Sequence, residues 1–258
     1  MPYRQETNIV GSNEIIFLRV IISILGAVFL YIGIPWIHKQ SLRLLLKRKT
    51  RKFKCFALTF DDGMSFHNGP GAKLTTAVLD ILAQYNVKAT FFLVGRHITG
   101  REEVVTRIKA DGHEIGVHGY EHLNYWKVSP FRALSDIKRG SEVVNEILRT
   151  SRVAYPFRPP YGKLNLLCLL YLWICRVPIV YWTFDLGDTW PADKRDSQRI
   201  VAMAKECDGA VVLAHDFDRI DESANQMVLE SVSGILAQAD KRAMPLLTVS
   251  QLLKGHKQ

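Results

Sequence analysis

Two adjacent aspartates, Asp61 and Asp62, follow a short apolar run at 56–60 and precede a glycine. Carboxylates at the end of a buried strand are costly unless a cation or a hydrogen-bond donor compensates their charge. An isolated Asp-Asp-Gly is also common as a turn or a helix cap. The pair therefore indicates a site only if other reactive side chains are predicted to lie beside it.

Two histidines, His118 and His122, stand four residues apart directly after another apolar run at 114–117. Placed on one helical turn, they would face the same way and share a metal ion. A carboxylate from Asp61 or Asp62 would complete a set of two imidazoles and one oxygen, with positions left for water and substrate. Zinc is the expected ion, and cobalt, nickel or iron would also fit. The alternative is a pair of ordinary surface or core histidines.

Three more predicted strands end in side chains that could serve a reaction. Arg158 stands in the rigid sequence FRPPYG and can hold a carboxylate with two parallel hydrogen bonds. Asp185 begins the stretch DLGDTW, which ends in an aromatic ring of the kind on which sugars stack. His215 closes the run VVLAH. Each has a structural explanation by itself, but five such strand ends in one chain indicate an active site.

The segments that carry these side chains alternate between strand-like and helix-like patterns. Short apolar runs predict strands at 56–60, 90–94, 114–117, 155–158, 179–184, 210–214 and 245–247. Amphipathic stretches predict helices near 72–85, 102–110, 130–149, 164–174, 195–206 and 222–239. Such alternation is typical of parallel strands joined by right-handed crossovers. We therefore expect an α/β fold, a distorted (β/α) barrel of about seven parallel strands, with the reactive residues at the carboxyl ends of the strands.

From about Phe56 to Leu253 the chain resembles the polysaccharide deacetylase family, also called carbohydrate esterase family four. The resemblance depends on five motifs, which occur in the family's order: TFDDG, HxxxH, RPPYG, DxxD and LxH. It implies an enzyme that uses a divalent metal to remove an N-acetyl, or similar N-acyl, group from an amino sugar. The substrate would be an N-acetylated polysaccharide, oligosaccharide or lipid-linked saccharide.

The resemblance also implies a role for each matching residue. The metal ligands would be Asp62, His118 and His122. The catalytic residues would be Asp61 as general base, Arg158 to orient it, His215 as general acid, Asp185 to tune its charge, and Tyr161, whose backbone N–H would help hold the oxyanion. The substrate-binding residues would be Pro160, Trp190 and Leu213, with Leu213 lining the acyl pocket. Two positions depart from the family: Gly119 stands where Ser or Thr is usual, and Trp190 follows DxxD one residue late.

Other functions are compatible with much of the same pattern. A deformylase or an O-acyl esterase would use the same reacting groups on the same fold. A catalytically inactive, membrane-tethered carbohydrate-binding protein would need only the fold. The intact set of acid, base and metal ligands argues against the inactive protein.

The segment from Ile15 to Ile37 is mostly apolar with Arg19 as its only charge, and it exceeds the about 20 residues that a membrane-crossing helix needs. Arg19 lies near one end, where it can reach the headgroups, and Trp36 lies near the other. A buried core helix is the alternative, and a cleaved signal peptide fits less well. We therefore expect four parts: a tail at 1–14, a transmembrane helix at 15–37, a basic linker at 38–54 and a catalytic domain at 55–258.

The net charge of +9 is concentrated at one end of the chain. Residues 1–54 carry ten Lys or Arg and two Glu, so the remainder is nearly neutral and no nucleic-acid-binding face is expected. The positive-inside rule predicts a single-pass protein of the bacterial cytoplasmic membrane, with the catalytic domain on the cytoplasmic side. The apolar run at 164–174 predicts a buried barrel helix, or alternatively a helix that dips into the bilayer.

Overall fold

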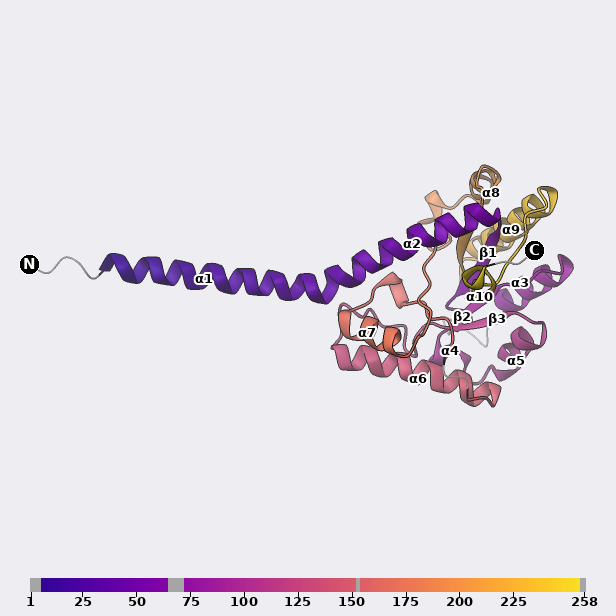
Figure 1. The fold of residues 1–258 in the computed structure, drawn as a ribbon. Helices are drawn as coiled ribbons and strands as arrows, with labels where there is room; N and C mark the ends of the chain where they lie inside the picture. Colours follow the sequence, from indigo (N-terminus) through magenta and orange to yellow (C-terminus); the bar gives the residue numbers. More distant parts are fainter. Residues whose placement is uncertain (1–5, 65–71, 152–153, 256–258) are drawn as a thin grey trace, which may run out of the picture.

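The computed structural model describes residues 6–64, 72–151 and 154–255. Its centre is a five-stranded parallel sheet with the strand order β3-β2-β1-β5-β4 (Figure 1). The strands are β1 (Phe56–Asp61), β2 (Thr90–Leu93), β3 (Glu114–Val117), β4 (Phe184–Asp185) and β5 (Ala210–His215). All residues of β1 and β2 are buried, as expected for parallel strands covered on both faces. The predicted α/β fold with a parallel sheet is therefore confirmed.

The expected number of about seven strands is not confirmed, because the described residues form five. The segments at 155–158 and 245–247, and the first part of 179–184, make only isolated parallel bridges. The bridges are Val117 with Phe157, Phe157 with Ile179, and Phe56 with Leu246. Proline has no N–H to donate to a ladder, and prolines lie within or directly beside each of these segments. The prolines are Pro156, Pro159, Pro178 and Pro245.

Helices flank the sheet, and six of them lie at predicted positions. They are α3 (Lys73–Gln84), α5 (Glu102–Ala110), α6 (Pro130–Leu148), α7 (Leu166–Ile174), α8 (Ser197–Lys205) and α9 (Glu222–Lys241). Two short helices outside the predicted set are α4 (Gly95–Ile98) and α10 (Val249–Lys254). The start of α6 shows why the sequence is informative: Ser129 accepts a hydrogen bond from the Arg132 N–H, and Pro130 occupies the first turn.

One long helical segment precedes β1, and its first half projects away from the domain (Figure 1). It consists of α1 (Glu6–Val28), a π-helical turn η1 (Phe29–Gly33) and α2 (Ile34–Phe53). Within the described residues it is the one helix long and apolar enough to cross a membrane. Side chains 14–30 are all exposed, so this stretch is not a core helix. Residues 6–14 belong to α1 and do not form a separate tail, and residues 1–5 lie outside the described part.

The basic segment 38–54, predicted as a linker, is the docked second half of this helix. Leu46 and Thr50 on α2 are buried against the domain. Three basic side chains donate hydrogen bonds to backbone carbonyls: Lys39 to Gly162 at 3.0 Å, Arg43 to Trp182 at 3.0 Å and Lys49 to Leu253 at 2.6 Å. The linker prediction is wrong because long basic side chains can lie along a protein surface and reach its carbonyls.

Candidate active site

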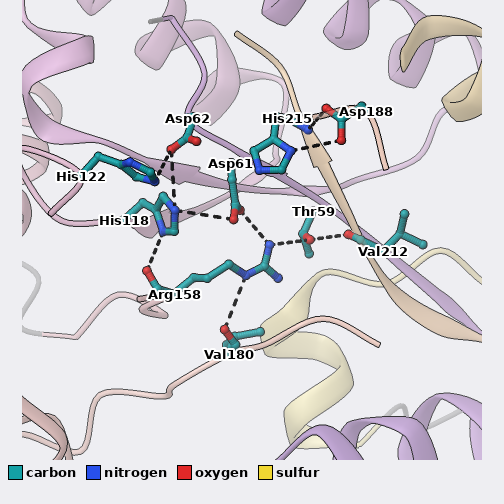
Figure 2. Close-up of polar contacts among 10 residues, drawn as sticks. All are labelled: Thr59, Asp61, Asp62, His118, His122, Arg158, Val180, Asp188, Val212 and His215. Carbon is teal, nitrogen blue, oxygen red and sulfur yellow. Dashed lines mark hydrogen bonds and ion pairs between the residues drawn. The ribbon is translucent and has the colours of Figure 1, made fainter. Parts of the chain in front are cut away.

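Asp61 is the last residue of β1, and a buried arginine holds its carboxylate (Figure 2). Arg158 Nη1 lies 2.7 Å from Asp61 Oδ1 and 2.8 Å from the hydroxyl oxygen of Thr59. The guanidinium is fully buried and stacks on Phe92, 4.2 Å from the ring centroid. The predicted contact of Arg158 with a carboxylate is therefore present, with one bond to Asp61 and one to Thr59 in place of a two-bond fork.

Asp62, His118 and His122 form a group that could hold a metal ion, with one potential ligand atom from each residue within 4.8 Å of the others. Asp62 Oδ1 lies 3.6 Å from His118 Nε2 and 3.3 Å from His122 Nε2 (Figure 2). The same oxygen is buried, and none of the described residues donates a hydrogen bond to it. A buried carboxylate oxygen that faces two imidazole nitrogens needs a positive charge beside it. The three residues therefore fit a divalent cation.

The two histidines do not share a helical turn, contrary to the prediction. Residues 118–122 form a loop in which Gly119 and His122 have φ angles of 79° and 57°. His118 Nδ1 lies 2.6 Å from the carbonyl oxygen of Arg158, so this nitrogen donates and Nε2 is free to bind a cation. The positive φ angles of Gly119 and His122 reverse the direction of the chain. This reversal brings the Nε2 atoms of His118 and His122 close to the same carboxylate oxygen of Asp62.

Burial is the largest influence on the pKa values of the two histidines and of Asp61 and Asp62. It lowers the pKa of His122 to about 4 and the pKa of His118 well below its usual value. Both imidazoles are therefore neutral near pH 7, which is the form that binds metals. Burial raises the pKa of Asp61 and of Asp62 to about 6, and the Arg158 charge opposes the increase at Asp61.

His215 ends β5, and the strand register pairs it with Asp61. Its Nδ1 lies 3.1 Å from Asp188 Oδ1, and its backbone N–H donates to Asp188 Oδ2 at 3.1 Å (Figure 2). Arg219 Nη2 donates to the same Oδ2 at 2.6 Å. Burial lowers the pKa of His215, but the carboxylates of Asp188, Asp62 and Asp61, with Asp188 contributing most, together outweigh burial and raise it to about 9. The β1–β5 pairing thus places a basic imidazole beside the buried carboxylate.

Asp188, and not Asp185, is the acid that contacts His215. The Asp185 carboxylate accepts a hydrogen bond from the Gly187 N–H at 2.8 Å. The predicted role of Asp185 beside His215 is therefore wrong, and Asp188 is the residue that sequence reasoning missed. The motif DxxD contains both acids, and its spacing alone does not say which of them turns back toward β5.

The remaining predicted residues surround this centre to different degrees. The Tyr161 ring lies 4.6 Å from the His122 ring, and Tyr161 has a left-handed φ of 57°. Leu213 is buried in β5, two residues before its end, and Pro160 is also buried. Trp190 is 46% exposed, as a ring that stacks on a sugar must be. Their predicted contacts with substrate remain predictions.

Gly119, where the family usually has Ser or Thr, lies against the Asp136 carboxylate of α6. Asp136 accepts hydrogen bonds from the Glu121 N–H at 2.7 Å and from the Tyr125 hydroxyl at 2.8 Å. A Cβ atom on Gly119 would overlap Asp136 Oδ2 and lie 2.8 Å from the Tyr125 oxygen. Asp136 therefore occupies the space of the missing side chain and supplies a hydrogen bond to the loop between the two histidines.

The fold and the site together define a class of protein. It is an α/β protein with a candidate metal centre where parallel strands end, the usual place for active sites in such folds. An arginine-held carboxylate and an acid-paired histidine flank that centre, and such groups can remove and supply protons.

Comparison with known proteins identifies the family. The polysaccharide deacetylase family matches residues 48–172, a range that contains the Asp61–Arg158 pair and the three candidate ligands. A chitooligosaccharide deacetylase of Rhizobium leguminosarum bv. trifolii is 31% identical over 168 residues, which are 65% of this chain and 74% of that protein. The chain therefore belongs to the polysaccharide deacetylase family.

Other relatives extend the comparison. The peptidoglycan-N-acetylglucosamine deacetylase PgdA of Listeria monocytogenes is 32% identical over 179 residues, 66% of this chain but 34% of that protein. The chain thus spans about a third of the length of this relative. The structure of peptidoglycan deacetylase PdaC from Bacillus subtilis matches with a TM-score of 0.64 and 27% identity, over 79% of this chain and 92% of that one.

Proposed function

We propose that the protein is a metal-dependent hydrolase that removes the N-acetyl group of an amino sugar and releases acetate and the free amine. The observation that carries the proposal is the convergence of Asp62, His118 and His122 beside the Asp61–Arg158 pair. The names of the relatives, which include chitooligosaccharide and peptidoglycan deacetylases, support an N-acetylated carbohydrate as substrate.

Asp62, His118 and His122 would hold the divalent ion, with zinc as the expected metal and cobalt, nickel or iron as alternatives. When bound, the ion would polarise the acyl carbonyl and lower the pKa of a coordinated water. Asp61 is the general base and takes a proton from the attacking water. Arg158 orients Asp61 and keeps it ionised, because a buried positive charge favours the carboxylate form.

His215 is the general acid and gives a proton to the departing amine. The Asp188 carboxylate accepts the hydrogen bond from Nδ1, so the proton on Nε2 is the one that can be transferred. The backbone N–H of Tyr161 would hold the oxyanion, and losing a donor of this kind typically costs ~10²–10³ in rate. Leu213, Pro160 and Trp190 would contact the acyl group and the sugar.

A deformylase or an O-acyl esterase would use the same groups, so the acyl product decides between them. The test is the full chain, loaded with zinc, cobalt or nickel, on an N-acetylated glucosamine oligomer and on its N-formylated and O-acetylated counterparts, with acetate, formate and free amine measured together. We expect equal amounts of acetate and amine, and loss of most activity in Asp61→Asn and in His215→Ala with the metal retained. Full activity in Asp61→Asn would exclude this mechanism, and formate from a formylated substrate alone would favour the deformylase.

We further propose that α1 anchors the protein in a membrane. From Ile15 to Val28 its one charged residue is Arg19, and all side chains in this stretch are exposed. A water-exposed apolar helix of this length is unfavourable, whereas a bilayer would cover it. The basic residues of α2 predict that the domain lies on the cytoplasmic side.

A further inference from the structure

Helix α7 has an exposed apolar surface. Its sequence, LLCLLYLWI, contains no charged residue, so the side that faces away from the domain is apolar too. Leu170 is 45% exposed, Trp173 75% and Ile174 71%. A helix at a water-facing protein surface normally carries polar residues there. An exposed apolar surface of this kind is typical of a site that contacts a membrane or another protein.

The position of α7 in the fold indicates what covers this apolar surface. Helix α7 contacts η1 and the start of α2, at the end of the domain from which α1 projects (Figure 1). The side chains of the long helix are exposed up to Leu30 and become half-buried from Tyr31 to Ile34. The domain therefore begins to touch the helix at Tyr31, on the side formed by α7.

The length of the apolar segment fixes the level of the bilayer relative to α7. Asn13 and Glu14 are polar, so the hydrocarbon begins no earlier than Ile15. About 20 residues are needed to cross it, which places its other boundary at about Ile34. A later start, after Arg19, would move this boundary farther toward the domain. The residues that contact α7 thus lie at the membrane boundary in the first case and inside the hydrocarbon in the second, so α7 is at the level of the bilayer in either case.

We propose that α7 rests in the membrane interface, where Leu170, Trp173 and Ile174 enter the boundary between headgroups and acyl chains. The inference rests on the proposed membrane span of α1. Trp36 on α2 is 52% exposed at the same level, and tryptophan prefers this zone of a bilayer. Arg176, exposed two residues beyond α7, can reach the anionic headgroups.

This arrangement brings the active site close to the bilayer. Lys39 lies five residues beyond Ile34, about 8 Å along the helix. Its ammonium group donates to the carbonyl oxygen of Gly162 at 3.0 Å. The neighbouring Tyr161 ring contacts the His122 ring. The loop beside the candidate metal centre is thus tied to the helix just outside the headgroups, so the favoured substrate class is an amino sugar anchored to a lipid.

Tryptophan fluorescence tests the membrane contact itself. The full chain is placed in vesicles of phosphatidylcholine and phosphatidylglycerol that contain phosphatidylcholine brominated near the top of the acyl chains. We expect Trp173→Phe to lower the amount of fluorescence that the brominated lipid quenches by about half, since Trp36 is then the remaining tryptophan at the interface. Trp190→Phe, which removes an exposed ring near the active site, is the matched control and should not lower the quenched signal. Equal quenching in the wild type and Trp173→Phe would overturn the proposal.

Activity tests the substrate class separately. Ile174→Glu is compared with Met203→Glu, which changes an exposed apolar residue on α8. With an N-acetylglucosamine linked through phosphate to a lipid, Ile174→Glu should be slower by about tenfold, the order expected when the apolar contact of one side chain is lost. With a water-soluble oligomer both variants should match the wild type.

The outcomes separate the two proposals. If Ile174→Glu slows both substrates equally, the lipid-anchored substrate is excluded. If the wild type releases acetate from neither substrate, the proposed function fails and the substrate class fails with it. The quenching result does not depend on activity, so it decides the contact of α7 with the membrane in either case.

Discussion

Arg158 organises the site at the scale of single residues. Its guanidinium is fully buried and donates to Asp61, while its backbone carbonyl accepts the hydrogen bond from His118 Nδ1. The side chain thus orients the proposed base, and the main chain fixes which nitrogen of the first histidine is free. A buried charge of this kind is tolerated because a carboxylate, a hydroxyl and an aromatic ring surround it.

The pair of His215 and Asp188 predicts the alkaline limit of activity. His215 must be protonated to act as the acid, and its folded-state pKa of about 9 lies above its ordinary value of 6.5. Activity should therefore fall as the pH rises through about 9. In Asp188→Asn the largest of the raising charges is absent while burial still lowers the pKa, so the fall should move to lower pH. The pH dependence of kcat/KM measures this, and an unmoved alkaline limb would contradict the assignment.

The same pair affects stability with a defined sign. Because the folded-state pKa of His215 is raised, the stabilisation is fully present below pH 6.5 and is lost as the pH rises through about 9. The Asp188→Asn variant should show a smaller dependence, which denaturant titrations at several pH values would measure.

Asp136 is predicted to set the affinity for the metal without touching it. In Asp136→Ala the Glu121 N–H and the Tyr125 hydroxyl lose their acceptor, and the loop from His118 to His122 is held less firmly. Losing a group that supports metal ligands typically costs about 10–100-fold in metal affinity. Tyr125→Phe removes only the hydroxyl and should have a smaller effect. Titration with a metal indicator measures both, and unchanged affinity in Asp136→Ala would disprove this role.

The sequence predicts most of these residues, because reactive side chains at strand ends occur in recognisable motifs. The role of Asp188 was not predicted because the motif DxxD contains two acids. The path of the loop after β4 decides which of the two contacts His215. The role of Asp136 was not predicted for a similar reason. Asp136 lies within α6, and its contact with Gly119 depends on how that helix packs. Contacts between distant segments are thus the part that spacing does not predict.

At the scale of elements, helices were easier to predict than strands. Five of the six predicted helices of the domain, all but α7, have amphipathic patterns, and four of the six have a side-chain cap, such as Ser129 at α6. The runs at 155–158 and 179–184 have strand-like composition, but nearby prolines restrict their pairing to bridges. The loop after β3 illustrates a second limit, since positive φ angles at Gly119 and His122 replace the expected helical turn.

Helix α2 packs on the folded domain, although its basic composition suggests a linker, and this packing should contribute to stability. Leu46 packs with Cys55, Val211 and Leu252. Leu46→Ala should lower the free energy of unfolding by about 2–4 kcal/mol, the usual cost of a buried cavity. Leu45 is 45% exposed, so Leu45→Ala is the matched control and should change stability by less than about 0.5 kcal/mol. Denaturant titration of the full chain would show the difference, and equal values would contradict the docking of α2.

At the scale of the whole molecule, helix α1 and the apolar surface of α7 lie toward one end of the domain (Figure 1). The basic charge is concentrated in the long helical segment, since residues 1–54 carry nearly all of the net charge. This distribution predicts the orientation. A reporter phosphatase that works only outside the cytoplasm, fused to the C-terminus, should be inactive. Strong phosphatase activity would place the domain outside and would favour an extracytoplasmic polymer as substrate.

The central claim is that Asp62, His118 and His122 bind one divalent cation on which catalysis depends. Metal analysis of the purified full chain, together with the variant His122→Ala, tests it most directly. We expect about one metal ion per chain in the wild type and a large loss of both metal and acetate release in the variant. A metal-free wild-type protein that takes up no ion when offered, or a variant that releases acetate without metal, would contradict the claim.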